Sequence, residues 1–209
     1  MIEMFGSALV TFLVIIDPPG CAPIFASLTR SASPAERRAM AIRSCLIAWC
    51  ILMFFALLGK PMLGALGISL ASFRVAGGIL LFYIAIEMVF EKRTERRESR
   101  AHSIKGTPDA DDISVFPMAI PMIAGPGSIA STMLWVSHAE TRLHVAVVLA
   151  AITVVILITV VTLLAAGPLM RIIGERIEAM ITRLLGVILS ALAAQFVIDG
   201  LRQSFPALG

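Results

Sequence analysis

The sequence predicts an all-α, polytopic membrane protein with six transmembrane helices. The chain of 209 residues is 58% apolar and only 15% charged, and its mean hydropathy is +0.94. A soluble domain needs polar residues to cover its core, so lipid must be the main solvent of this chain. Runs of about 20 apolar residues, the length that crosses a bilayer, occur at 4–28, 39–59, 68–90, 113–137, 143–166 and 180–201.

The loops indicate how these helices are oriented. With six spans, the side that holds the loops after the first, third and fifth helices carries thirteen Lys and Arg residues, and the opposite side carries four. Basic loops stay in the cytoplasm, so we expect both termini on the non-cytoplasmic side of the cell inner membrane. This asymmetry also accounts for the net charge of +3, and nucleic acid is not an expected partner.

One long polar stretch divides the chain. Residues 91–112 carry six basic and six acidic side chains, with no net charge, which is typical of a solvated linker. The predicted organisation is a first three-helix repeat at 1–90, a charged cytoplasmic linker at 91–112 and a second three-helix repeat at 113–209.

The first and fourth spans are predicted to be broken near the middle of the membrane. Asp17-Pro18-Pro19-Gly20 interrupts the first span and Gly125-Pro126-Gly127 the fourth. Proline removes a helical N–H donor and clashes with the preceding turn, and glycine adds flexibility. Broken backbone at this depth is tolerated only where it is buried in protein or lines a cavity. Paired breaks of this kind are the best sequence indication of a transporter's binding site.

An ordered internal similarity supports two repeats. Pro19-Gly20 aligns with Pro126-Gly127 at an offset of 107, and Arg74-x-x-Gly77 aligns with Arg183-x-x-Gly186 at an offset of 109. Each repeat contains three helices, so the second copy would enter the membrane from the opposite side. The prediction is an inverted pair of repeats with a binding site at their interface.

Two sets of residues are candidates for substrate or ion binding. Asp17, with Pro18 and Gly20, places a carboxylate at membrane depth, where it could bind a substrate ammonium group, carry a proton or sodium ion, or cap the second half-helix. The second break offers bare N–H groups and a hydroxyl, suited to a substrate carboxylate; its residues are Gly125, Pro126, Gly127 and Ser128. A kink without any binding role is the competing interpretation of these glycines.

Other residues are assigned structural or gating roles. Arg74 and Arg183 open the third helix of each repeat, where arginines usually extend to the lipid head groups. Gly77 and Gly78 permit close helix packing. The cysteines and histidines lack ligand spacing, so neither a metal site nor a cofactor is expected, and no arrangement of a nucleophile with a base suggests an enzyme.

Three segments also resemble the signatures of the MarC family of integral membrane proteins, within the wider lysine-exporter superfamily. They are Asp17–Phe25 (DPPGCAPIF), Phe73–Phe82 (FRVAGGILLF) and Pro117–Ile129 (PMAIPMIAGPGSI). The resemblance implies six helices in the prokaryotic inner membrane with both termini outside. It also implies transport of small neutral amino acids such as glycine or alanine, coupled to an ion gradient.

The leading hypothesis is therefore a secondary transporter that binds a small amino acid at the paired helix breaks, with a proton or sodium ion as coupling partner. The alternatives are an exporter of another small solute or drug, and a membrane scaffold that transports nothing. Assembly into a homo-oligomer stays open.

Overall fold

The computed structural model describes residues 1–93, 95–97, 99 and 112–205, and for residues 170–173, 175, 176 and 178 it describes the backbone alone. Within these ranges every regular element is a helix, which confirms the all-α prediction. The elements are α1 (Ile2–Ile16), α2 (Pro18–Leu28), α3 (Pro34–Ala65), α4 (Leu70–Val89), η2 (Ser114–Ile123), α6 (Pro126–Ser137), α7 (Arg142–Leu164) and α8 (Ala166–Ser204).

The described helices are long and apolar enough to cross a membrane five times, or six times if one bent pair counts as a single span. The bent pair is η2 with α6, whose axes differ by 53°. α1 and α2 together form the first span, Ile2–Leu28. The chain is therefore a polytopic helical protein, as predicted.

The second span is longer than the predicted range of 39–59, because α3 continues into polar residues at both ends. At its start, Ser33 accepts a hydrogen bond from the Glu36 backbone N–H (3.3 Å), and Glu36 accepts one from the Ser33 backbone N–H (2.7 Å). Such a capping box fixes where a helix begins. Hydropathy detects the apolar middle of a helix and misses a polar first turn of this kind.

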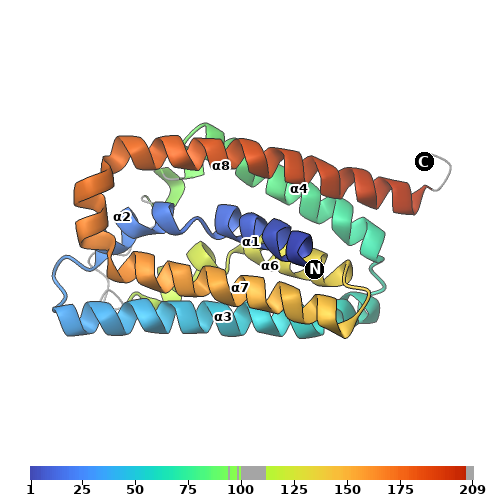
Figure 1. The fold of residues 1–209 in the computed structure, drawn as a ribbon, viewed down its shortest axis with the longest axis horizontal. Coiled ribbons are helices and arrows are strands. Elements are labelled where there is room, and N and C mark those ends of the chain that lie inside the picture. Colours follow the sequence, from blue (N-terminus) through green and yellow to red (C-terminus); the bar gives the residue numbers. More distant parts are fainter. Residues whose placement is uncertain (94, 98, 100–111, 206–209) are drawn as a thin grey trace.

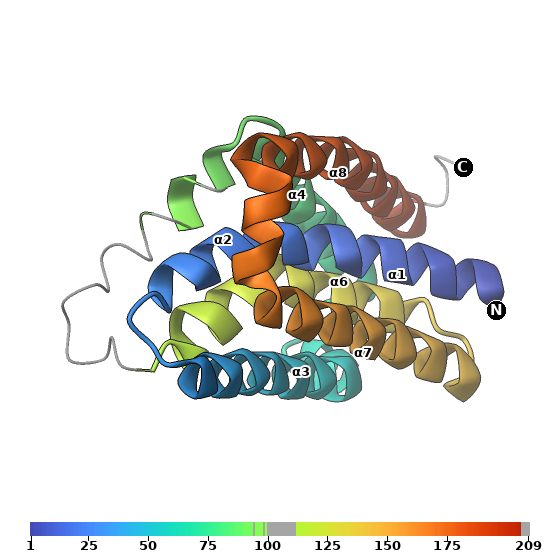
Figure 2. The same ribbon diagram turned by 60° about the vertical axis from the view of Figure 1, so that its left-hand side comes forward.

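The broken first span lies at the centre of the molecule (Figures 1 and 2). Its most apolar window is 72% buried, whereas those of the other continuous spans are 28–39% buried. Large side chains on the outer helices, such as Leu57, Val161 and Leu184, are more than half exposed and form the surface that lipid would cover. The N- and C-terminal ends both lie at one end of the bundle (Figure 1).

The helices pair across the two halves of the chain. α1 and α2 pack against α7 and α8, and η2 and α6 pack against α3 and α4. The most extensive contact joins α4 to α8, which lie side by side along one edge of the bundle (Figure 1). This seam is close because it contains glycine: a Cβ on Gly78 would lie 2.9 Å from Ala193 O, and one on Gly200 would lie 3.0 Å from Ala71 O.

Candidate functional site

The first helix break is centred on Asp17. α1 ends at Ile16, Asp17 adopts a left-handed conformation with φ 56°, and α2 begins at Pro18. Asp17 Oδ1 accepts a hydrogen bond from the Gly20 backbone N–H at 3.2 Å. Asp17 therefore caps α2, with proline in the first helical turn, where its missing N–H costs nothing. The carboxylate is also buried, with 1% of the residue exposed.

The second break lies between η2 and α6. Gly125 is the N-cap of α6, Pro126 is its first residue, and no side chain caps this end. Gly125 is packed so closely that a Cβ there would lie 2.3 Å from Pro121 O. Ser128 donates its hydroxyl to Ile123 O at 2.7 Å, across the break. The two breaks thus begin two helices, α2 and α6, in the interior of the molecule.

Arginines from the segment after α4 enter this interior. We expected residues 91–112 to be a solvated linker, and for its described first part this expectation is wrong. Arg93 and Arg97 are only 7% and 8% exposed. Glu91, with φ 61°, turns the chain at the end of α4, and its carboxylate is held by Arg183 at 2.5 Å. The remainder of the linker, residues 100–111, lies outside the described residues.

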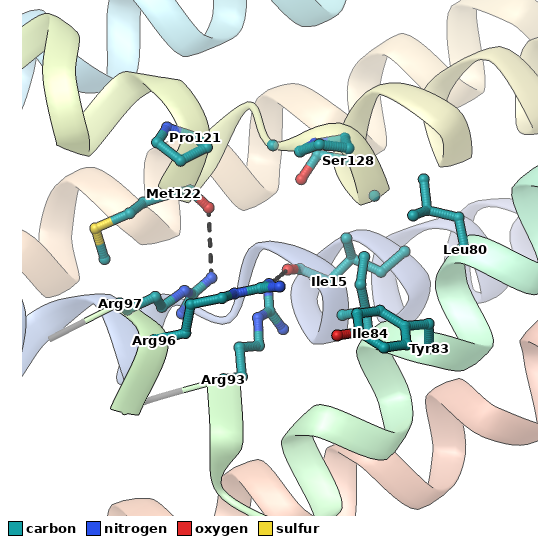
Figure 3. A pocket seen from close by; sticks show the side chains of 13 residues that line it. Ile15, Leu80, Tyr83, Ile84, Arg93, Arg96, Arg97, Pro121, Met122 and Ser128 are labelled. Carbon is teal, nitrogen blue, oxygen red and sulfur yellow. Dashed lines mark hydrogen bonds between the residues drawn. The ribbon is translucent and has the colours of Figure 1, made fainter. Parts of the chain in front are cut away.

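Arg97 connects the two breaks. Its Nη1 lies 3.2 Å from Asp17 Oδ2, and its Nη2 donates to Met122 O at 3.4 Å (Figure 3). Asp17 thereby gains a counterion at membrane depth, where an unpaired carboxylate would be very costly. The carbonyl of Met122, near the end of η2, gains a donor that the interrupted helix does not supply.

Arg93 plays a similar part at the end of α1, but without an acid. Its Nη2 donates to Ile15 O at 2.5 Å, and its Nη1 lies 2.9 Å from Met88 Sδ (Figure 3). No salt bridge joins Arg93 to a carboxylate in the described part of the chain. Desolvation lowers the pKa of Arg93 to about 9, which reflects the cost of burying a cation whose hydrogen-bond partners are neutral.

Glu87 is the second acid of this region. From its place near a span end we expected it to face water, and the structure shows this to be wrong, because Glu87 is 6% exposed. Arg96 Nη2 lies 2.8 Å from Glu87 Oε2, an ion-pair distance, although the contact lacks hydrogen-bond geometry and this oxygen has no hydrogen-bond partner. Arg96 thus supplies the countercharge for Glu87, as Arg97 does for Asp17.

A cavity of about 260 Å³ opens between these groups (Figure 3). One wall is the start of α6, from Gly125 to Ser128. The opposite walls come from α1, α4 and the three arginines. Its lining residues are Ile15, Leu80, Tyr83, Ile84, Arg93, Arg96, Arg97, Pro121, Met122, Gly125, Pro126, Gly127 and Ser128. Asp17 is absent from this lining and lies behind Arg97.

The structure therefore separates the predicted site residues. Gly125, Pro126, Gly127 and Ser128 line the cavity, whereas Asp17, Pro18 and Gly20 form the cap of α2 beside it. Gly127 is in close contact with the opposite wall, since a Cβ there would lie 2.6 Å from Ile84 Cδ1. None of the described residues form a group of three or more His, Cys, Asp or Glu placed to hold a metal ion.

The predicted gating residues lie away from the cavity. Arg74 donates to Gln203 Oε1 at 2.8 Å, and Arg183 pairs with Glu91, so these arginines join α4 to α8 and to the turn that follows α4. Gly78 belongs to the same seam, and Gly77 lies against α6, where its Cβ would meet Leu134 Cδ1 at 2.9 Å.

The three cavity arginines were missed from sequence. Their spacing, at positions 93, 96 and 97, places them on one face of a helical turn. Two acids within the spans, Asp17 and Glu87, each need a countercharge. Together these two facts carry the signal that the zero net charge of the linker concealed.

Buried ion pairs, broken helices and a lipid-facing exterior define a polytopic integral membrane protein with an internal cavity. The chain belongs to the MarC family of integral membrane proteins, whose family model matches residues 2–205.

Curated relatives agree with this assignment. The chain is 36% identical over 203 residues to the UPF0056 membrane protein MJ1677 of Methanocaldococcus jannaschii, covering 96% of this chain and 97% of that protein. It is 34% identical over 200 residues to the UPF0056 inner membrane protein YhgN of Escherichia coli K12, covering 94% and 95%. It is 33% identical over 208 residues to a UPF0056 membrane protein of Archaeoglobus fulgidus, covering 99% and 96%. No solved structure matches the chain.

Proposed function

We propose that this protein is a secondary transporter of small neutral amino acids of the glycine and alanine class, driven by an ion gradient, and that it binds its substrate in the cavity at the start of α6. The observation that carries the proposal is the position of this cavity. It lies between two interrupted spans, where the positive end of α6 faces the lining residues, and half-helix ends of this kind bind substrates in transporters.

The size of the cavity favours a small solute. Pockets for drug-sized ligands occupy roughly 300–1,000 Å³, and this cavity measures about 260 Å³. Export of a bulky drug is therefore the weaker alternative. Polar groups continue beyond the cavity along α6: Ser131 Oγ and Trp135 Nε1 are buried and lack hydrogen-bond partners among the described residues. Such groups suit a path for a polar solute or for water.

The helix pairing supports two inverted repeats. The broken first span of each half packs against the second and third helices of the other half. Gly67 and Gly174, which have φ values of 67° and 69°, precede the third helix of each half at the same offset of 107 that relates Gly20 to Gly127. Exchange of conformations between such repeats is a known basis of alternating access.

Asp17 and Glu87 are the candidates for coupling to a proton or sodium ion, because they are buried acids beside the cavity. Both are paired with arginines here. A cation would bind only after Arg97 or Arg96 withdrew, so coupling would accompany movement of the segment after α4. With the basic loops in the cytoplasm, this segment would lie on the cytoplasmic side and both termini on the other.

The test is uptake of labelled glycine and alanine into proteoliposomes, with imposed proton and sodium gradients. Accumulation that collapses when one gradient is dissipated would support the proposal and identify the ion. An absence of uptake and efflux under every gradient would count against amino acid transport and favour another solute or a scaffold role.

A further inference from the structure

The cavity carries an excess of positive charge. Three arginines line it, and two acids stand behind them, each within ion-pair distance of one arginine. Arg93 is the member of the three that has no salt bridge to a carboxylate in the described residues, and it is 93% buried by the measure that gives its 7% exposure. A buried charge without an opposite charge is strongly destabilising, so this position calls for an anion.

Arg93 retains hydrogen-bonding capacity that the protein does not use. A guanidinium has five N–H donors, and the contacts of Arg93 are to the Ile15 carbonyl and the Met88 sulfur. These contacts fix the side chain in place. The planar fork of arginine matches a carboxylate, which can accept two parallel hydrogen bonds.

The far wall of the cavity offers donors to the same anion. The first N–H groups of a helix have no acceptor within the helix, and α6 begins at Pro126 without a side-chain cap. Gly127 and Ser128 supply such N–H groups at the cavity lining. The absence of a side chain on Gly127 leaves its backbone accessible, and a cation and a helix N-terminus in one cavity both attract negative charge.

We infer that Arg93 binds the carboxylate of the transported solute and that this anionic group, more than the ammonium group, determines which solutes enter the cavity. This inference rests on the proposed function in placing the substrate at this cavity. It also revises the role of Asp17, whose carboxylate is already neutralised by Arg97 and which belongs to the supporting structure of the site.

The test compares three probes of nearly equal size on the purified full-length protein by isothermal titration calorimetry. L-alanine carries both charges, propionate carries only the carboxylate, and L-alaninamide carries only the ammonium group. We expect L-alanine and propionate to bind and L-alaninamide to bind at least roughly 10-fold more weakly, since a hydrogen bond to a charged group has about this effect on affinity. Equal binding of L-alaninamide and L-alanine would overturn the inference.

Variants identify the residue. Arg93→Gln should weaken propionate binding on the order of 10- to 100-fold. The matched control is the double variant Glu87→Gln/Arg96→Gln, which removes an ion pair from the same region without changing its net charge, and which should leave propionate affinity within a few-fold of the parent. Arg93→Lys keeps the charge and loses the fork, so it should recover part of the affinity even if Arg93→Gln folds poorly. Unchanged affinity in Arg93→Gln would overturn the inference.

The two proposals fail separately. Propionate binding that depends on Arg93, without any amino acid transport in proteoliposomes, would sustain the anion site and reject the proposed function. Alanine transport with unaltered KM in Arg93→Gln would do the reverse.

Discussion

Gly20 lies directly against the carboxylate of Asp17, so that a Cβ added to Gly20 would come within 2.2 Å of Asp17 Oδ2. The same carboxylate caps α2 through the Gly20 N–H and pairs with Arg97. The glycine therefore leaves room for a buried acid that serves two partners at once.

Gly20→Ala should displace this carboxylate and destabilise the protein. Loss of the helix cap alone costs about 1–2 kcal/mol, and disturbance of the ion pair adds to it. Denaturant unfolding in detergent would measure the difference. Gly6→Ala in α1 is the control, because a Cβ there meets nothing within 4 Å. Equal stability of the two variants would contradict the assigned role of Gly20.

Asp17→Ala should be more harmful than Asp17→Asn. The alanine variant removes both the cap and the countercharge of Arg97, and breaking a buried ion pair costs about 3–5 kcal/mol. Asparagine still accepts a hydrogen bond as an N-cap. In a double-mutant cycle on unfolding free energy, Asp17→Ala/Arg97→Ala should recover part of the loss. Strict additivity of the two single variants would argue against coupling between these side chains.

Gly127→Val should close the cavity at the start of α6 and abolish uptake of labelled alanine by proteoliposomes. The obstacle is Ile84 Cδ1, which would lie 2.6 Å from the added Cβ. Because this atom is the end of a side chain, Ile84→Ala should restore part of the activity to the milder variant Gly127→Ala. Full uptake by Gly127→Val would exclude close approach of substrate to this backbone.

Gly78→Ala should weaken the seam between α4 and α8. The new methyl would lie 2.9 Å from the Ala193 carbonyl oxygen, and backbone cannot move aside as a side chain can, so we expect a loss of about 1–3 kcal/mol. A thermal unfolding curve in detergent would record it as a lower Tm. Gly64→Ala in α3, where the space is open, should leave Tm unchanged or slightly raised; a matching loss there would indicate a general effect of helix substitutions.

Much of the fold follows from local sequence signals. Apolar runs indicate the spans because bilayer thickness fixes their length. The order Asp17-Pro18-Pro19-Gly20 indicates a helix start through well-understood capping chemistry, and α2 begins at Pro18. Such signals involve residues within a few positions of one another, so a single sequence displays them directly.

The electrostatics of the site depend on contacts between distant residues. Arg97 and Asp17 are 80 positions apart, and no local pattern links them. Counting charge over residues 91–112 gave zero and suggested solvent, although Arg93 and Arg97 turn inward. Glu87 was assigned to water from its place near a span end, because hydropathy does not show which side of a helix faces protein.

The exchange of first spans between the halves has a consequence for biosynthesis. When α1 and α2 leave the ribosome, α7 and α8, against which they pack, have not yet been made. The first half must therefore wait in the bilayer with its most buried span unpartnered. The segment that carries Arg97 is synthesised soon after α4, and it can neutralise Asp17 during that wait. A chain cut within residues 100–111 should consequently yield two fragments that are each degraded alone and accumulate only when expressed together.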